Sequence, residues 1–386
     1  FKARVVDVFK GPNGQHIHKI KLLDGIIHVN DEVEVIIDKQ RRKEIEANHS
    51  GVHILQYALQ TIVDKNIKQA GSYVDEEKLR FDFTCPSKIS DEEIVKTEDF
   101  VNNIIKRNVI TSTETMPLDK AKELGAMALF GEKYGDTVRV VKIDKSIELC
   151  GGTHVANTKD IKKFAIFNFE SKGSNTYRIE AVTGNRLEST LFEVIKPYND
   201  EMVKLLIKAK EILALARKQN IDLSFDVEID NTAPTSYKDI IFNQNELSYI
   251  QSEVKTLEKT YNNELEKLTL SSLDNYTSRV KEINGKKILY LELDNIAMFL
   301  VKAMADDLCN KFDQVVILLA DIKEDNSVNF ICRSSIPSVN AGYIVKNITA
   351  AFGGNGGGSP TFAQGGIKDK NKLTEIKEAL KDLLNE

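Results

Sequence analysis

The first forty residues alternate between apolar and polar positions, as strands with one solvent-exposed face do. Alternating runs at 3–9, 16–20 and 33–37 are separated by turn-forming residues, among them Gly11-Pro12-Asn13-Gly14. We interpret residues 1–40 as antiparallel strands of a partial β-barrel. The chain has no initiator Met, so we expect a fragment whose earlier strands are missing.

From residue 41 onward the spacing of apolar residues changes to that of a helix. Apolar positions recur in steps of three and four from Ile45 to Ile62, and further helices are predicted over 91–107 and 117–129. Helices and strands mix up to residue 186, so we predict one α+β domain over 41–186. Its predicted strands are 72–74, 79–83, 137–143, 164–169 and 177–182.

A long, polar and mostly helical region follows over 187–283. Its clearest apolar stripe runs from Ile250 to Leu268, and such a stripe more often serves ordinary packing than a dedicated partner site. The interruption at 221–238 contains Asn231-Thr232-Ala233-Pro234. We interpret it as the loop of a long helical hairpin.

Residues 284–386 are predicted to form a separate, C-terminal globular α/β domain. A glycine-rich run from Gly353 to Pro360 precedes a last charged amphipathic helix, and we expect the run to lie in turns. The fold class expected for the whole chain is therefore α+β multidomain. Strands and helices alternate in this last domain at 287–291, 296–312, 315–319, 328–332 and 339–352.

Composition narrows the functional class without deciding it. The net charge of −5 over 386 residues neither favours nor excludes a nucleic-acid partner, because net charge hides local patches. No apolar run approaches the roughly 20 residues that cross a bilayer, so no membrane partner is expected. Four cysteines without a C-x-x-C pair predict a reducing, cytoplasmic protein.

Two pairs of residues are candidate ligands of a metal ion. His49 and His53 lie four apart on a predicted helix and so share one face, while Cys150 and His154 flank a Gly-Gly turn. A lone pair of histidines on a helix usually has a surface or packing role, and a lone Cys is usually a small core residue. Together, however, the two pairs offer nitrogen and sulfur donors that suit Zn²⁺. Four protein ligands favour a closed structural site, whereas a catalytic site normally keeps one position open.

Several motifs, in family order, resemble the editing domain of alanyl-tRNA synthetases. The run Gly356-Gly357-Gly358-Ser359-Pro360, followed by Ala363-Gln364-Gly365-Gly366, resembles the family's C-terminal domain. Ser359 and Tyr177 stand where the family commonly has Arg, and we expect the chain to lack the family's aminoacylation domain. The motifs of the editing domain are Arg41-Arg42, Asn48-His49-Ser50-Gly51-Val52-His53, Gly125 to Gly135, Glu148 to His154, and Arg178 to Gly184.

The resemblance implies a zinc-dependent hydrolase that deacylates wrongly charged tRNA(Ala). Such a second sieve releases serine or glycine and spares alanine. The four His and Cys residues would be the zinc ligands and the catalytic centre. The zinc would have one of two roles: it would activate the ester or a water molecule, or it would hold the substrate. Gln69 matches a pocket glutamine of the family, and Thr153 is a candidate partner of the serine hydroxyl. The plainer alternatives are a polar helix end at Gln69 and a structural turn hydroxyl at Thr153.

Contacts with tRNA(Ala) are implied in two parts of the chain. Arg41 and Arg42 would receive phosphates of the acceptor stem. The C-terminal domain would contact tRNA and form a homodimer, although a turn-rich closure of its sheet is the plainer interpretation of the glycines. The alternative function is a non-catalytic tRNA-binding and dimerisation module with a structural zinc. The tRNA-contacting residues implied in the C-terminal domain are Gly356, Gly357, Gly358 and Gln364.

Overall fold

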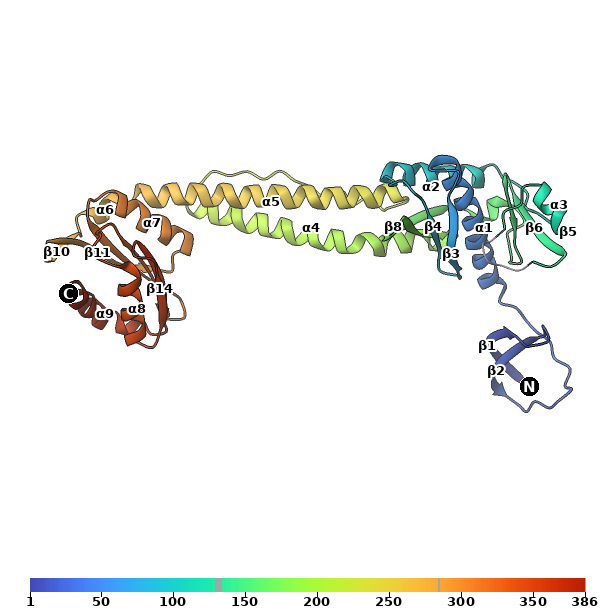
Figure 1. Cartoon of the computed structure of the whole chain (residues 1–386), viewed down its shortest axis with the longest axis horizontal. Coiled ribbons are helices and arrows are strands. Elements are labelled where there is room, and N and C mark those ends of the chain that lie inside the picture. The colour runs from blue at the N-terminus through green and yellow to red at the C-terminus, as the bar shows by residue number, and fades with distance from the viewer. Residues whose placement is uncertain (129–133, 284, 386) are drawn as a thin grey trace. The chain divides into compact units, whose positions relative to one another are not determined.

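The computed structural model describes residues 1–128, 134–283 and 285–385 (Figure 1). The chain divides into two compact units. The first comprises 1–195 and 233–241, and the second comprises 196–232 and 242–386. Among the described residues, every helix is too short or too polar to cross a membrane. The domain boundaries after residues 40, 186 and 283 remain sequence predictions.

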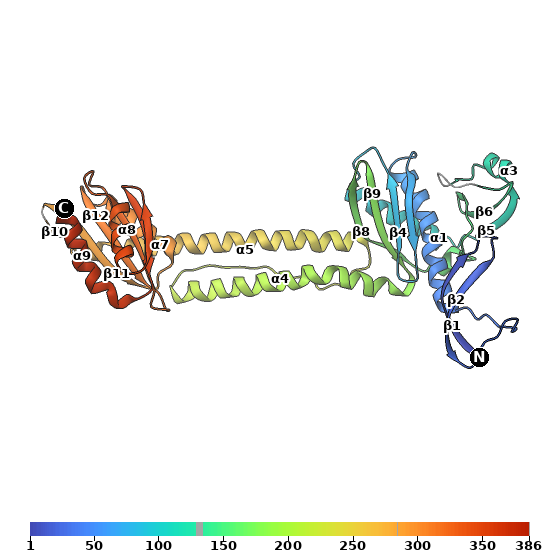
Figure 2. The ribbon, with the colours of Figure 1, turned by 60° about the horizontal axis from the view of Figure 1, so that its bottom comes forward.

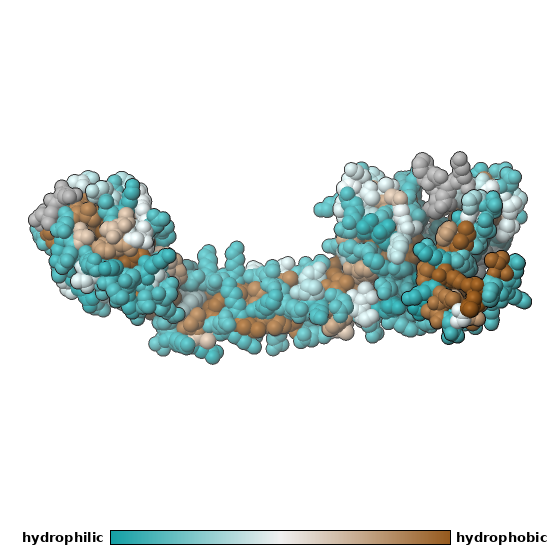
Figure 3. All heavy atoms as spheres, turned by 90° about the horizontal axis from the view of Figure 1, so that it is seen from below, coloured by the Kyte–Doolittle hydropathy of each residue, from teal (hydrophilic) through white to brown (hydrophobic). Residues whose placement is uncertain are grey.

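The N-terminal segment is a two-stranded antiparallel ribbon of β1 (Lys2–Lys10) and β2 (His16–Asp24). The strand expected at 33–37 is wrong, because residues 25–38 form no strand in the structure. The expected partial barrel is therefore only a ribbon, and a ribbon alone cannot bury a face. Its apolar side chains, such as Val5 and Phe9, are accordingly exposed, and Figure 3 shows an apolar patch there.

A four-stranded antiparallel sheet with two helices forms the centre of the first unit. Alternate side chains of β4, Leu79, Phe81 and Phe83, are fully buried and form part of the core. Asp38 caps α1, and a capping box of Ser90 and Glu93 begins α2. The elements are α1 (Lys39–Ile62), β3 (Lys68–Val74), β4 (Leu79–Thr84), α2 (Asp91–Lys106), η1 (Thr158–Ile161), β8 (Phe164–Gly173), β9 (Thr176–Thr183) and η2 (Gly184–Arg186).

A second, three-stranded sheet lies between α2 and β8 in the sequence. The helix expected over 117–129 is shorter, because α3 ends before Gly125, whose positive φ ends the helical conformation. The end of that expected helix and part of the Gly125–Gly135 motif lie outside the described residues. Strands β5 and β7 were not expected. The elements are β5 (Ser112–Pro117), α3 (Leu118–Glu123), β6 (Thr137–Ile143) and β7 (Ser146–Leu149).

The two long helices, α4 (Leu187–Lys218) and α5 (Tyr237–Ser271), lie side by side (Figures 1 and 2). Gln244 bonds Tyr198 at 3.0 Å, and Lys208 pairs with Glu258 at 2.7 Å. The residue numbers of the two partners rise together, so the helices are parallel. The expected helical hairpin, whose helices would be antiparallel, is therefore wrong.

The connection over 219–236 makes this parallel arrangement feasible. A residue advances the chain by about 3.3 Å when it is extended and by about 1.5 Å when it is helical. An extended connection therefore needs only about half as many residues as α4, which has 32, to return along the length of that helix. Every second residue from Leu223 to Ile229 is apolar and packs on a core that includes Ile250 and Val254. The expected loop is therefore an extended segment that covers the helix pair.

The C-terminal part contains a six-stranded mixed sheet in the order β10-β11-β12-β13-β15-β14. Strands β11 and β12 are parallel, and the remaining described neighbours are antiparallel. Helix α7 packs on one face, while α8 and α9 pack on the other. The elements are α6 (Asp274–Thr277), β10 (Lys281–Ile283), β11 (Lys286–Asp294), α7 (Met298–Asn310), β12 (Val315–Ile322), β13 (Val328–Ser334), α8 (Ala341–Ala351), β14 (Asn355–Gly358), β15 (Phe362–Ile367), η3 (Lys370–Lys372) and α9 (Leu373–Asn385).

Within the glycine-rich run, expected to lie in turns, Gly353 does lie in a turn, but Asn355–Gly358 form the edge strand β14. A Cβ atom at Gly356 or at Gly365 would lie 2.7 Å from a methyl carbon of Val345 on α8. At Gly357 a Cβ atom would meet nothing within 4 Å. Glycine at the first two positions therefore lets α8 pack directly on the backbone of the sheet.

Candidate metal centre

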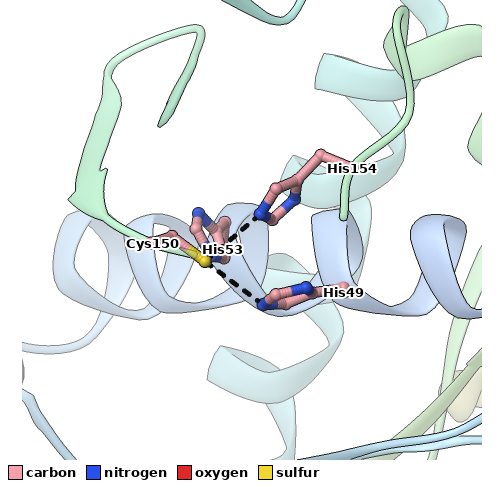
Figure 4. A group of neighbouring side chains, drawn as sticks. All are labelled: His49, His53, Cys150 and His154. Carbon is pink, nitrogen blue, oxygen red and sulfur yellow. Dashed lines mark hydrogen bonds between the residues drawn. The ribbon is translucent and has the colours of Figure 1, made fainter. Parts of the chain in front are cut away.

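Helix α1 and the segment after β7 bring the four His and Cys residues together (Figure 4). His49 and His53 project from one face of α1, and one ligand atom from each of the four residues lies within 4.8 Å of the others. The sulfur of Cys150 lies 3.6 Å from Nε2 of His49 and 3.4 Å from Nε2 of His154. The arrangement expected from the sequence is thus present, and we call it the His/Cys cluster.

Each imidazole of the His/Cys cluster has an oxygen atom near Nδ1, which leaves Nε2 available as a ligand. Hydrogen-bonded oxygen partners orient the rings of metal-binding histidines, and His49 and His154 have such partners. Nδ1 of His53 makes no hydrogen bond among the described residues and only lies near a carboxylate. None of these partners was assigned this role from the sequence. They are the carbonyl oxygen of Thr153 at 3.2 Å from His49, the hydroxyl of Ser50 at 3.1 Å from His154, and a carboxylate oxygen of Glu148 at 3.5 Å from His53.

The turn between Cys150 and His154 is held in place by Arg139 and depends on glycine. One guanidinium nitrogen of Arg139 donates to the carbonyl oxygens of Cys150 and Gly152, each at 2.7 Å. A Cβ atom at Gly152 would overlap the imidazole of His49, so no larger residue fits without displacing that ring. Arg139 lies on β6, and sequence spacing gave no signal of its role.

Burial sets the protonation of the cluster. It lowers the pKa of His49, brings the pKa of His154 to about 3, and holds the pKa of His53 well below its usual value. The positive charge of Arg139 acts in the same direction on all three. The histidines are therefore neutral at neutral pH, the form that binds metal ions. Burial also raises the pKa of Glu148 to about 7.

The donor set fits zinc. In a tetrahedral site with usual bond lengths, nitrogen and sulfur ligand atoms lie roughly 3.3–3.6 Å apart. The two measured separations from the Cys150 sulfur, 3.4 and 3.6 Å, match this range. All the ligand atoms of the cluster lie within 4.8 Å of one another, so binding needs a contraction on the order of 1 Å at most. His49, His53, Cys150 and His154 are thus the residues that would hold the ion.

A cavity of about 400 Å³ opens beside the cluster and is lined by His49, His53 and Cys150. This volume lies within the range of small-molecule sites. Gln69 lies on strand β3 and not at a helix end, and its amide donates to the hydroxyl of Ser72 at 3.1 Å. Further lining residues are Val52, Gln56, Gln60, Lys65, Asn66, Ile67, Lys68, Ser72, Met127, Ala128, Glu148 and Leu149.

The structure brings some of the other expected site residues to this cavity and leaves others elsewhere. Gln69 lines it, whereas Thr153 contacts the cluster through its carbonyl oxygen. Arg41 and Arg42 lie at the start of α1, where Arg41 pairs with Glu76 at 2.9 Å. The glycines of β14, with Gln364 opposite Gly357 on β15, belong to the second unit. Gln56 was missed, although it stands three residues after His53 on α1.

Comparisons with known proteins find matches to two parts of the chain. Residues 138–180 match the model of the threonyl and alanyl tRNA synthetase second additional domain, and residues 285–386 match the DHHA1 domain. The C-Ala domain of Aquifex aeolicus alanyl-tRNA synthetase is a further structural match, with 25% identity and a TM-score of 0.27. The match covers 28% of this chain and 98% of that domain.

Sequence relatives match along the whole chain. The alanine–tRNA ligase of Halalkalibacterium halodurans is 37% identical over 378 residues, which cover 97% of this chain and 40% of the relative. The alanine–tRNA ligase of Endomicrobium trichonymphae is 35% identical over 396 residues, covering 100% of this chain and 42% of the relative. The chain therefore spans about two fifths of the length of these relatives. It belongs to the alanine–tRNA ligase family and corresponds to the C-terminal part of its members.

Proposed function

We propose that the chain is an aminoacyl-tRNA hydrolase that deacylates Ser-tRNA(Ala) and Gly-tRNA(Ala). The observation that carries this proposal is the cavity whose wall includes three members of the His/Cys cluster. Membership of the alanine–tRNA ligase family supplies the substrate class. The cavity would receive the aminoacyl end of the tRNA, because only that part is small enough to enter it.

The residues of the site have separate tasks in this proposal. Zinc, when bound, supplies a Lewis acid that polarises an ester or lowers the pKa of a water, or a fixed charge that positions the substrate. Arg139 and Gly152 hold the turn that presents Cys150. Ser50 orients the imidazole of His154, the carboxyl of Glu148 lies beside the imidazole of His53, and Gln69 offers an amide to the aminoacyl group.

A second function is favoured by one observation, namely that four protein ligands suffice for a closed zinc site. On this alternative the zinc is structural, and the chain binds tRNA(Ala) and dimerises without turnover. The two functions share one proposed partner surface in the C-terminal domain. There Gly357 leaves open space, and Gln364 opposite it is exposed. Dimerisation through this domain, phosphate contacts at Arg41 and Arg42, and action in the cytoplasm complete the proposal.

The test is amino-acid release from Ser-tRNA(Ala), with Ala-tRNA(Ala) as the control substrate. The proposed hydrolase releases serine and spares alanine, and a Cys150→Ala variant loses at least tenfold in the rate of serine release. The control variant is Cys85→Ala, because Cys85 is a buried free cysteine that does not belong to the cluster. Stoichiometric zinc and tRNA binding without serine release would instead establish the binding module.

A further inference from the structure

Gln56 lines the cavity beside the cluster and carries an unpaired, buried acceptor. Its side chain is only 5% exposed, and it lines the cavity from the helix that carries His49 and His53. Its amide nitrogen points at the sulfur of Met127, at 3.4 Å. Its Oε1 atom is buried and has no hydrogen-bond partner among the described residues. Buried acceptors are normally satisfied, so this oxygen points to a ligand.

The next glutamine along the same face of α1 makes a useful contrast. Gln60 also lines the cavity and also points its amide at the sulfur of Met127, at 3.6 Å. That amide, however, donates to the carbonyl oxygen of Ile67 at 2.9 Å. Gln60 therefore has a structural partner, whereas the oxygen of Gln56 is available to a bound molecule.

The surroundings of Gln56 indicate what kind of donor it accepts. Val52, Ile67 and Met127 line the cavity with apolar atoms and a thioether. The carboxyl of Glu148 already accepts from the hydroxyl of Ser146 at 2.8 Å. A buried ammonium group needs an ionised partner, whereas a hydroxyl needs only a neutral acceptor. The oxygen of Gln56 is thus suited to a neutral O–H donor.

We infer that Gln56 determines which aminoacyl group the site accepts, by taking a hydrogen bond from the serine hydroxyl. This inference rests on the proposed hydrolase function. Glycine leaves room for a water that donates to the same oxygen. The methyl group of alanine displaces that water and leaves the oxygen buried and unpaired, which opposes binding. One acceptor thereby admits serine and glycine and rejects the amino acid that must be spared.

The experiment compares kcat/KM for Ser-tRNA(Ala) and Ala-tRNA(Ala) in the zinc-loaded chain and in Gln56→Met. The methionine removes the acceptor at similar volume, so the preference for serine over alanine should fall at least tenfold. Gln56→Glu keeps an acceptor oxygen and should retain most of the preference. The matched control is Gln40→Met, the same change at an exposed position of α1 outside the cavity. Should Gln56→Met fail to fold, Gln56→Ala removes the same oxygen without adding bulk.

A binding measurement gives a second readout that does not depend on turnover. Seryl and alanyl adenosine analogues, in which an amide replaces the ester, are titrated calorimetrically into the same variants. The unmodified chain should bind the seryl analogue at least tenfold more tightly than the alanyl analogue. The Gln56→Met variant should bind the two analogues with equal affinity. An active chain whose preference survives Gln56→Met would overturn the role of Gln56 alone. A chain that hydrolyses neither ester would overturn the proposed function and this inference with it.

Discussion

Replacing Glu98 by glutamine tests how the start of α5 is held within the first unit. Glu98 lies on α2 and is only 3% exposed. Its Oε2 atom accepts from the backbone N–H of Ile166 at 2.6 Å and from that of Tyr237 at 3.2 Å. Because one oxygen serves both donors, a glutamine can keep both hydrogen bonds.

The effect depends on pH, and its magnitude follows from the pKa. Burial raises the pKa of Glu98 to about 8 from an ordinary value of 4.5. Below pH 4.5 the carboxyl is protonated whether the chain is folded or unfolded, so its burial does not lower the free energy of unfolding through ionisation. Between pH 4.5 and 8 only the unfolded chain ionises, and the free energy of unfolding falls as pH rises. At 1.36 kcal/mol per pKa unit the loss reaches an upper figure of about 5 kcal/mol at pH 8.

The assay is urea unfolding of the chain and of Glu98→Gln at intervals from pH 5 to pH 9. The glutamine cannot ionise, so the variant should gain stability over the unmodified chain as pH rises. The matched control is Glu92→Gln on the same helix, where the side chain is 77% exposed and pairs with Lys96. Parallel stability curves for Glu98→Gln and the unmodified chain would refute the reasoning, because Glu98 would then ionise in the folded state.

Three further substitutions test the cluster and the C-terminal sheet. Gly152→Ala should weaken zinc binding roughly 10–100-fold in competition with a chromophoric chelator, because the added Cβ atom displaces the imidazole of His49. Gly151→Ala is the control and should bind zinc normally, because its Cβ atom would meet nothing within 4 Å. Equal zinc affinities of the two variants would contradict the overlap. Glu148→Gln should lower zinc affinity by about 10–100-fold in the same assay, because it removes the carboxylate that lies beside Nδ1 of His53. An unchanged affinity would show that this carboxylate does not support the ligand. Gly356→Ala should lower the free energy of unfolding of the C-terminal sheet by about 1–3 kcal/mol in urea, with Gly357→Ala close to neutral. Equal losses for these last two would contradict the close packing of α8.

The sequence was most informative where spacing along one element decides geometry. The four-residue step from His49 to His53 placed both rings on one face of a helix, and the Gly-Gly turn allowed Cys150 and His154 to approach each other. The partners of the imidazoles could not be predicted in this way, because the approach of His154 to Ser50 depends on tertiary packing. Gln56 is an intermediate case, since its step of three from His53 placed it on the right face but gave no sign of its unpaired oxygen.

The fold was less predictable where pairing between distant segments decides it. The apolar stripe of α5 predicted a helix but contained no information on the direction of its neighbour α4. We interpret residues 221–238 as a loop from the sequence, whereas the alternating residues from Leu223 to Ile229 form an extended segment that packs on the helix pair. At 33–37 a similar alternation predicted a strand that does not form, because a strand also needs a partner to bond. Alternation alone therefore did not separate the two cases.

X-ray absorption at the zinc edge of the zinc-loaded chain tests most directly whether the His/Cys cluster binds the ion beside the cavity. The account predicts one zinc per chain, with one sulfur at about 2.3 Å and three nitrogens at about 2.0–2.1 Å. Loss of the sulfur signal in Cys150→Ala would assign it to this residue. A shell of oxygen and nitrogen without sulfur, or a chain that retains no zinc, would contradict the account.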